Sequence, residues 1–133
     1  MNNPISKTDS NSIITIDSVA HADTNHQGKI IVCGSHGGKS AVQHLLQFKP
    51  AGAIFNDAGK GKNDAGIKGL LVMNEAGIPA ATVDTFSAEI GDGKDTYENG
   101  IISAVNNQAN QYGITVGMQT KEATTLMMQN VEI

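Results

Sequence analysis

From residue 30 onward, apolar runs rich in β-branched residues alternate with segments of helical periodicity, and this alternation most constrains the fold. The expected strands are 13–16, 30–33, 51–55, 79–83 and 114–116. The expected helices are 41–48, a segment capped by Asp64 and ended by Gly77, 96–111 and 121–129. Strands that alternate with helices are typical of βαβ units, in which helices cover both faces of a parallel sheet. The sequence therefore predicts an α/β fold in three layers, α/β/α, with a mainly parallel sheet of about five strands.

The longest expected helix, 96–111, rests on two local signals. Asp95 and Glu98 have the spacing of a capping box. Apolar or small side chains then recur at four-residue steps, namely Tyr97, Ile101, Val105 and Ala109. We expect these four residues to form the buried stripe of that helix.

Length and composition bound the class of protein. A chain of 133 residues is long enough for one domain with a single core, and we assign it to residues 12–133. Residues 1–11 are polar and without periodicity, so we expect a mobile tail. No apolar stretch approaches the roughly 20 residues of a membrane span. A single cysteine, Cys33, and no apolar run typical of a signal peptide favour a soluble, cytoplasmic protein.

The charged residues argue against a nucleic-acid partner. The chain has 13 acidic and 9 basic residues, all nine of them lysine, and a formal net charge of -4. Binding to a phosphate backbone favours a basic surface, and guanine edges are usually read by arginine. We therefore expect a small-molecule ligand, with no nucleic acid and no membrane as partner.

Residues 34–40 combine a strand end, a glycine-rich turn and a helix start. Glycines allow backbone N–H groups to approach a ligand, and a helix N-terminus adds partial positive charge. Ligands of open parallel sheets bind beyond the carboxyl ends of the strands, where strand order reverses. The polar loops 34–40, 56–62, 84–87 and 91–95 should meet there. The residues of the first loop that we expect to bind ligand are Gly34, Ser35, Gly37, Gly38, Lys39 and Ser40.

Residues 33–59 partly match two known motifs. The phosphate-binding P-loop, GxxxxGK[ST], matches at Gly38-Lys39-Ser40, but its first glycine position holds Cys33. Caspase-like proteases have Ser-His-Gly at one strand end and a cysteine at a later one. The chain has Ser35-His36-Gly37, but Asp57 stands at the cysteine position. The sequence therefore favours simple phosphate or carboxylate binding over nucleotide hydrolysis or cysteine proteolysis.

His36 and Asp57 are the candidate catalytic pair. A histidine and a carboxylate within reach of each other can supply general acid and base. Asn56 could donate to an oxyanion, and Lys39 or Lys60 could neutralise a substrate's charge. The remaining expected ligand-binding residues are Gly59 and Ser87. The alternative is that Asp57 caps a turn and His36 closes its own loop by a hydrogen bond.

The other polar clusters predict no metal site and no cofactor. His21, Asp23 and His26 match no compact ligand template, so a solvated loop is the simpler interpretation. Cys33 lies in an apolar run and is most simply a small buried hydrophobe.

The function predicted from the sequence is a small enzyme of the hydrolase or lyase type that acts on a compact, polar and anionic metabolite through His36 and Asp57. The alternative is a non-catalytic module or subunit that binds phosphate or carboxylate at the same turn. A third interpretation is a self-assembling scaffold. A homo-oligomer is expected because a small domain buries only part of its apolar surface.

Overall fold

The computed structural model of the chain describes residues 12–131, so the predicted tail at 1–11 lies outside the described residues. One sheet contains β1 (Ile13–Ile16), β2 (Ile30–His36), β3 (Gly52–Asn56), β4 (Ala80–Val83) and β5 (Ile102–Val105). The strands lie side by side in chain order, the first four parallel and β5 antiparallel to β4. The predicted α/β class with a mainly parallel sheet is confirmed.

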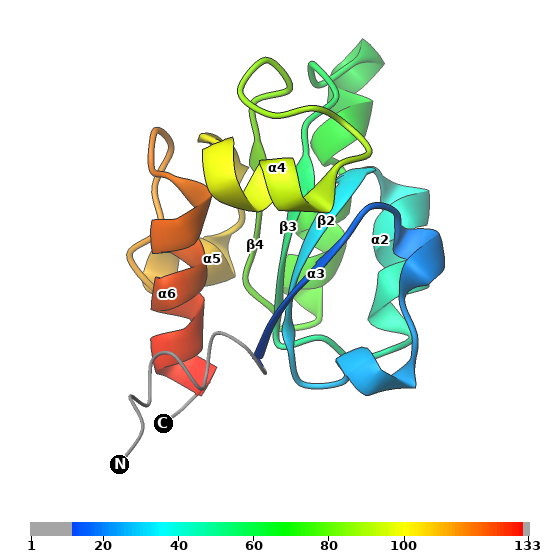
Figure 1. Cartoon of the computed structure of the whole chain (residues 1–133), viewed down its shortest axis with the longest axis vertical. Coiled ribbons are helices and arrows are strands. Elements are labelled where there is room, and N and C mark those ends of the chain that lie inside the picture. The colour runs from blue at the N-terminus through cyan, green and yellow to red at the C-terminus, as the bar shows by residue number, and fades with distance from the viewer. Residues whose placement is uncertain (1–11, 132–133) are drawn as a thin grey trace.

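Helices connect the strands and follow the last one (Figure 1). The α-helices are α2 (Lys39–Leu46), α3 (Gly69–Glu75), α4 (Gly93–Asn99), α5 (Asn107–Gln111) and α6 (Thr120–Val131). Short 3-10 helices are η1 (Val19–His21), η2 (Thr24–His26) and η3 (Lys62–Ile67).

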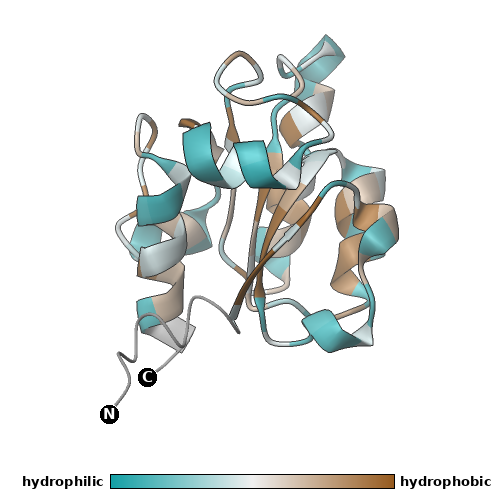
Figure 2. Ribbon diagram, in the orientation of Figure 1, coloured by the Kyte–Doolittle hydropathy of each residue, from teal (hydrophilic) through white to brown (hydrophobic). Residues whose placement is uncertain are grey.

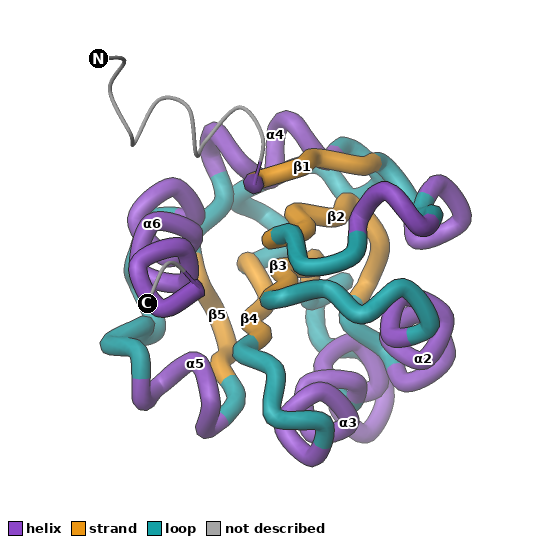
Figure 3. The backbone as a smooth tube through the Cα atoms, turned by 90° about the horizontal axis from the view of Figure 1, so that it is seen from below, coloured by secondary structure: helices purple, strands orange, loops and turns teal. Residues whose placement is uncertain are grey.

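The helices form one layer on each side of the sheet. Figure 3 shows α2 and α3 on one side of the strands and α5 and α6 on the other. Helix α4 packs against β2, β1 and α6 and crosses the carboxyl ends of the first two strands. In Figure 2 the strands at the centre are hydrophobic, whereas α4 is mostly hydrophilic. The three-layer arrangement expected from the sequence is therefore present.

Strand β2 shows why the central runs are apolar on both faces. Ile30 and Val32 belong to the core beneath α5 and α6, and Ile31 and Cys33 to the core beneath α2 and α3. All four side chains are buried. A strand covered on both faces has no polar face to present, which removes the alternation seen in half-exposed sheets.

The single helix expected at 96–111 is wrong, because this segment forms α4, β5 and α5. The backbone leaves the helical conformation at Gly100, which has ψ 141°. The β-branched residues that follow pair with β4, and Asn106 then caps α5 through its side chain. The N-cap of α4 is Asp92, whose Oδ1 accepts from the N–H of Asp95 at 2.9 Å. The four apolar or small residues at four-residue steps therefore lie in different elements and form no single helical stripe.

Two further local expectations are wrong. Residues 114–116 form no strand, and the fifth strand is β5. Asp64 caps no helix, because it has a left-handed φ of 60° within η3 and α3 begins at Gly69. On α3 the core-facing side chains are Leu70 and Met73, whereas Leu71 is 68% exposed.

The strand order also changes where a ligand can be expected. A sheet whose neighbours follow one another from β1 to β5 has no reversal of strand order among the described strands. The crevice that such a reversal opens in doubly wound sheets is therefore missing from this fold. A binding site must instead be formed by individual loops and the helices beside them.

Candidate functional site

The polar loops expected to meet at the carboxyl edge of the sheet contact one another. Gly91 donates its N–H to the carbonyl of Gly34 at 2.8 Å. Gly37 donates to the carbonyl of Asn56 at 3.0 Å, and Thr85 donates to Oδ1 of Asp57 at 3.0 Å. The loops after β2, β3 and β4 and the start of α4 are therefore joined by hydrogen bonds.

Gly34 and Gly37 are surrounded by protein. A Cβ at Gly34 would overlap the backbone N of Asp92, because α4 begins directly over β2. The carbonyl of Gly37 accepts from Gly69 at 2.8 Å, so this glycine binds α3 as well as β3. Both glycines thus permit close backbone packing, and the N–H of Gly37 is already engaged.

His36, the last residue of β2, turns back onto the residue that caps α2. Its Nδ1 accepts the N–H of Gly38 at 3.0 Å. The side chain is exposed, and its Nε2 makes no hydrogen bond within the described part of the chain. Asn56 and Asp57 form the same type of turn, since each accepts the N–H two residues further on. His36 therefore ends β2 as these two side chains end β3.

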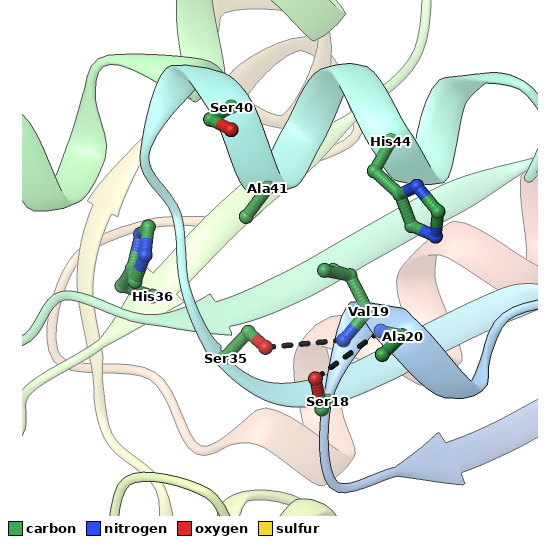
Figure 4. A pocket seen from close by; sticks show the side chains of 8 residues that line it. All are labelled: Ser18, Val19, Ala20, Ser35, His36, Ser40, Ala41 and His44. Carbon is green, nitrogen blue, oxygen red and sulfur yellow. Dashed lines mark hydrogen bonds between the residues drawn. The ribbon is translucent and has the colours of Figure 1, made fainter.

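A cavity of about 550 Å³ lies beside this turn, between η1 and α2. It is lined by Ser18, Val19, Ala20, Ser35, His36, Ser40, Ala41 and His44. In Figure 4, His36 lies at the β2–α2 turn, far from His44, whereas Ser40 comes from α2 and Ser18 and Ser35 lie beside η1. We call this cavity the serine–histidine pocket.

The hydroxyls of Ser18 and Ser35 are held by η1 (Figure 4). Ser18 Oγ accepts the N–H of Ala20, and Ser35 Oγ accepts the N–H of Val19, each at 3.1 Å. A serine hydroxyl that accepts from the backbone keeps its own O–H as a donor. The hydroxyl of Ser40 on α2 is exposed and makes no hydrogen bond to the described residues. Ser18 and Ser40 can therefore donate into the pocket, whereas the Ser35 hydroxyl also interacts with the Cys33 thiol.

The pocket contains only part of the predicted site. Ser35, His36 and Ser40 line it, as the sequence predicts for a site at this turn. Ser18 and His44 were missed. A signal existed for each: Ser18 follows the first β-branched run, and His44 lies four residues after Ser40, on the same face of a helix.

Asp57 is not among the residues that line the pocket. It is 3% exposed, and its Oδ1 accepts from Gly59 at 2.8 Å as well as from Thr85. The other oxygen, Oδ2, has no partner among the described residues and is not sealed from solvent. The carboxylate therefore joins the loop after β3 to the loop after β4.

The backbones of His36 and Asp57 lie close together in the sheet, because His36 on β2 pairs in register with Asn56 on β3. Within residues 12–131 no hydrogen bond or ion pair joins their side chains. Asp57 binds toward β4, whereas β2 lies on the opposite side of β3. The acid–base pair proposed from the sequence stays a prediction.

Asn56 and Ser87 are engaged in structural hydrogen bonds. The Asn56 side chain is fully buried and donates to the carbonyl of Ala88 at 3.2 Å. Ser87 Oγ donates to the carbonyl of Asp84 and accepts from the N–H of Ile101. In this conformation neither side chain is available to a ligand in the way predicted.

The remaining predicted ligand-binding residues, Lys39, Gly59 and Lys60, are exposed and outside the pocket lining. The loop from Ala58 to Asp64 carries four of the left-handed residues other than glycine, at Ala58, Lys60, Asn63 and Asp64. Left-handed conformations cost energy in such residues and are held by their surroundings. Here the hydrogen bond from Gly66 N to the carbonyl of Lys60, 2.8 Å, closes the loop.

A second cavity, of about 370 Å³, lies between η3, α3 and β5 and contains none of the predicted site residues. Its wall is mainly aliphatic, with Ile67, Leu70 and Val105 among the lining side chains. Its place and chemistry differ from those of the serine–histidine pocket.

Two further kinds of site that the side chains present could form are a metal site and a reactive thiol. Across residues 12–131, no group of three or more His, Cys, Asp or Glu side chains could hold a metal ion. Burial raises the pKa of the Cys33 thiol, which agrees with its expected place in the core.

No helix in the described part of the chain is both long and apolar enough to cross a membrane. Comparison of the chain with protein-family models, with curated proteins and with solved structures finds no match.

Proposed function

We propose that the chain binds a small anionic ligand, a phosphate or a carboxylate, in the serine–histidine pocket. The observation that carries this proposal is the chemistry of the lining: three serine hydroxyls, two imidazoles and no carboxylate. A wall of hydrogen-bond donors suits an acceptor ligand and gives a cation no oxygen anions to bind.

The size and position of the pocket support a compact ligand. Its volume of about 550 Å³ lies within the range of small-molecule sites. The pocket lies beside the carboxyl ends of β1 and β2, and Lys39 follows the turn directly. A lysine at this distance along the chain adds positive charge near the pocket without lining it.

The register of β2 and β3 supports a second candidate, catalysis of the hydrolase or lyase type. It places His36 opposite Asn56, one residue from the free Oδ2 of Asp57. In this candidate the exposed imidazole and the carboxylate act on one substrate that bridges the loops after β2 and β3. Under this proposal His36→Ala and Asp57→Asn each abolish turnover of small esters or hydroxy acids, whereas binding is largely retained. Unchanged rates in both variants would exclude it.

Association into a homo-oligomer and a cytoplasmic location remain proposals from the sequence. The exposure of the large apolar side chains of Phe86, 93%, and Leu71, 68%, is compatible with the first. The buried single cysteine is compatible with the second. Light scattering over a range of protein concentrations tests the oligomeric state.

Titration with inorganic phosphate and, separately, acetate tests the binding proposal. We expect the largest backbone NMR shift changes at Ser18, Ser35 and Ser40. Ser40→Ala removes one donor that makes no hydrogen bond to the described residues, so affinity should fall roughly fivefold, about 1 kcal/mol. Gln43→Ala, an exposed position on the same helix, is the matched control and should bind like the native chain. Shift changes confined to the loop of Lys60 and Lys62 would refute the proposed site.

A further inference from the structure

We infer that His36 is fixed in the tautomer that carries its proton on Nε2, and that it meets the ligand of the serine–histidine pocket as a hydrogen-bond donor. The inference rests on the proposed function for the ligand and on the structure for the tautomer. It replaces the general base expected from the sequence with a group that recognises an oxygen acceptor.

The hydrogen bond between Gly38 and His36 selects the tautomer. The backbone N–H of Gly38 points to Nδ1 at 3.0 Å, so Nδ1 must offer a lone pair. In a neutral imidazole one nitrogen carries the proton and the other accepts. The proton of the neutral ring therefore lies on Nε2.

The surroundings of the ring hold this arrangement. A Cβ at Gly38 would lie 2.6 Å from Nδ1 and 2.8 Å from Cε1 of His36, so the ring lies against the bare glycine backbone. Gly38 also begins α2, since its carbonyl accepts from Val42 at 3.0 Å. The backbone N–H that selects the tautomer is thus anchored by the helix.

The distal nitrogen is left free. Nε2 makes no hydrogen bond within the described residues, and His36 lines the pocket. We take the Nε2–H as a donor of this lining in addition to the serine hydroxyls. The ligand atom beside His36 must then be an acceptor, such as a carboxylate or phosphoryl oxygen.

Substitutions can separate the two nitrogens. His36→Asn keeps an oxygen that can accept from Gly38, as Asn56 does from Ala58, but it removes the distal donor. His36→Gln places an amide near the position of Nε2 and gives up the short turn. We expect His36→Asn to fold normally and bind inorganic phosphate roughly tenfold more weakly. His36→Gln should bind more tightly than His36→Asn.

Long-range ¹H–¹⁵N spectra of the neutral ring test the tautomer without any ligand. We expect Nδ1 of His36 to resonate as an unprotonated acceptor and Nε2 as a protonated nitrogen. A ring protonated on Nδ1, or an equal mixture of tautomers, would overturn the inference. His21 serves as internal reference, because it is exposed and its ring makes no hydrogen bond among residues 12–131.

The binding result separates the inference from the function on which it rests. If native protein binds phosphate at the pocket and His36→Asn binds equally well, the donor role is wrong and the pocket proposal stands. If native protein does not bind phosphate or acetate at all, the proposed function and the donor role both fall. The spectra then still report which nitrogen is protonated.

Discussion

The imidazole of His36 occupies the space that a side chain on Gly38 would need. The ring lies against the glycine and accepts its backbone N–H on Nδ1, so one contact lies between the end of β2 and the start of α2 and orients the distal nitrogen of the ring. The glycine-rich turn therefore packs around the side chain of His36. The groups that remain for a ligand are those on its exposed side.

Gly38→Ala should displace the ring with little loss of stability. The new Cβ would meet Nδ1 of an exposed side chain that can rotate away, and it would also lie 3.1 Å from the backbone carbonyl oxygen of Ala65, which needs only a small adjustment. The φ of -74° suits alanine. We expect the free energy of unfolding to fall by less than about 1 kcal/mol and the His36 ring resonances to change. Urea denaturation and the ring spectra measure the two effects. Gly37→Ala is the comparison: there the Cβ would lie 2.9 Å from Cγ2 of the buried Thr82 as well as 3.0 Å from the carbonyl oxygen of Gly66, and a loss of about 1–3 kcal/mol is expected. Equal losses in the two variants would contradict this account.

Gly34→Ala should separate α4 from the sheet. A Cβ there would collide with the backbone of Gly91 and Asp92 and with the carbonyl of Asp17, none of which can rotate away. We expect a loss of about 3 kcal/mol or more in unfolding free energy, with the largest amide shift changes at the start of α4. Gly28→Ala is a contrasting variant, because its Cβ would meet nothing within 4 Å and only its φ of 74° opposes the substitution. A smaller loss in Gly34→Ala than in Gly28→Ala would refute the packing argument.

Asn106→Ala should be among the most destabilising single changes. The Asn106 side chain accepts from Ala80 and Ala109 and donates to the carbonyls of Leu70 and Ile78. Its removal leaves these groups without partners where α3, β4 and α5 meet, and we expect a loss of about 3–5 kcal/mol. Asn107→Ala, at the exposed neighbouring position, should change stability by less than about 0.5 kcal/mol. Thermal and urea unfolding of both variants check the difference, and similar stabilities would count against the role of this side chain.

Asp95→Asn should reduce stability near neutral pH and converge with the native chain in acid. The amide of Asn99 and then the N–H of Glu89 bind the Asp95 carboxylate and lower its pKa from the usual 3.8. A carboxyl whose pKa is lower in the folded than in the unfolded state stabilises the fold at pH values above its unfolded-state pKa. This contribution disappears as the pH falls through the folded-state pKa. The difference in unfolding free energy between the two proteins should therefore shrink below pH 3.8. A difference that stays constant from neutral pH into acid would show that the ionised carboxylate contributes nothing.

The sequence identifies elements whose local pattern agrees with their tertiary environment. The run at 30–33 predicts a strand because both its faces are buried, and the turn after it predicts a helix start that the structure contains. The segment at 101–105 carries two compatible patterns, β-branched residues and a four-residue apolar repeat. Pairing with β4 decides between them, and that pairing depends on residues about 20 positions away, which no local window contains.

The candidate site also combines residues that a local pattern identifies with residues that only the tertiary structure brings together. Ser35, His36 and Ser40 belong to one continuous strand, turn and helix, so a local motif finds them together. Ser18 joins them only because β1 lies beside β2, whereas His44 follows Ser40 by four residues on the same face of α2. Asp57 was paired with His36 from strand order alone, and the direction of its side chain depends on the N–H of Thr85, on a third loop.

The strand order has a consequence for how the chain assembles during synthesis. Every strand of the sheet from β1 to β5 is added beside the one before it, so no later segment has to insert between two strands that are already paired. Each new strand can dock on an edge that exists as it leaves the ribosome, and the nascent sheet can grow in one direction. Only when α6 follows does the second face of the central strands become covered, which makes the C-terminal helix the step that completes the core.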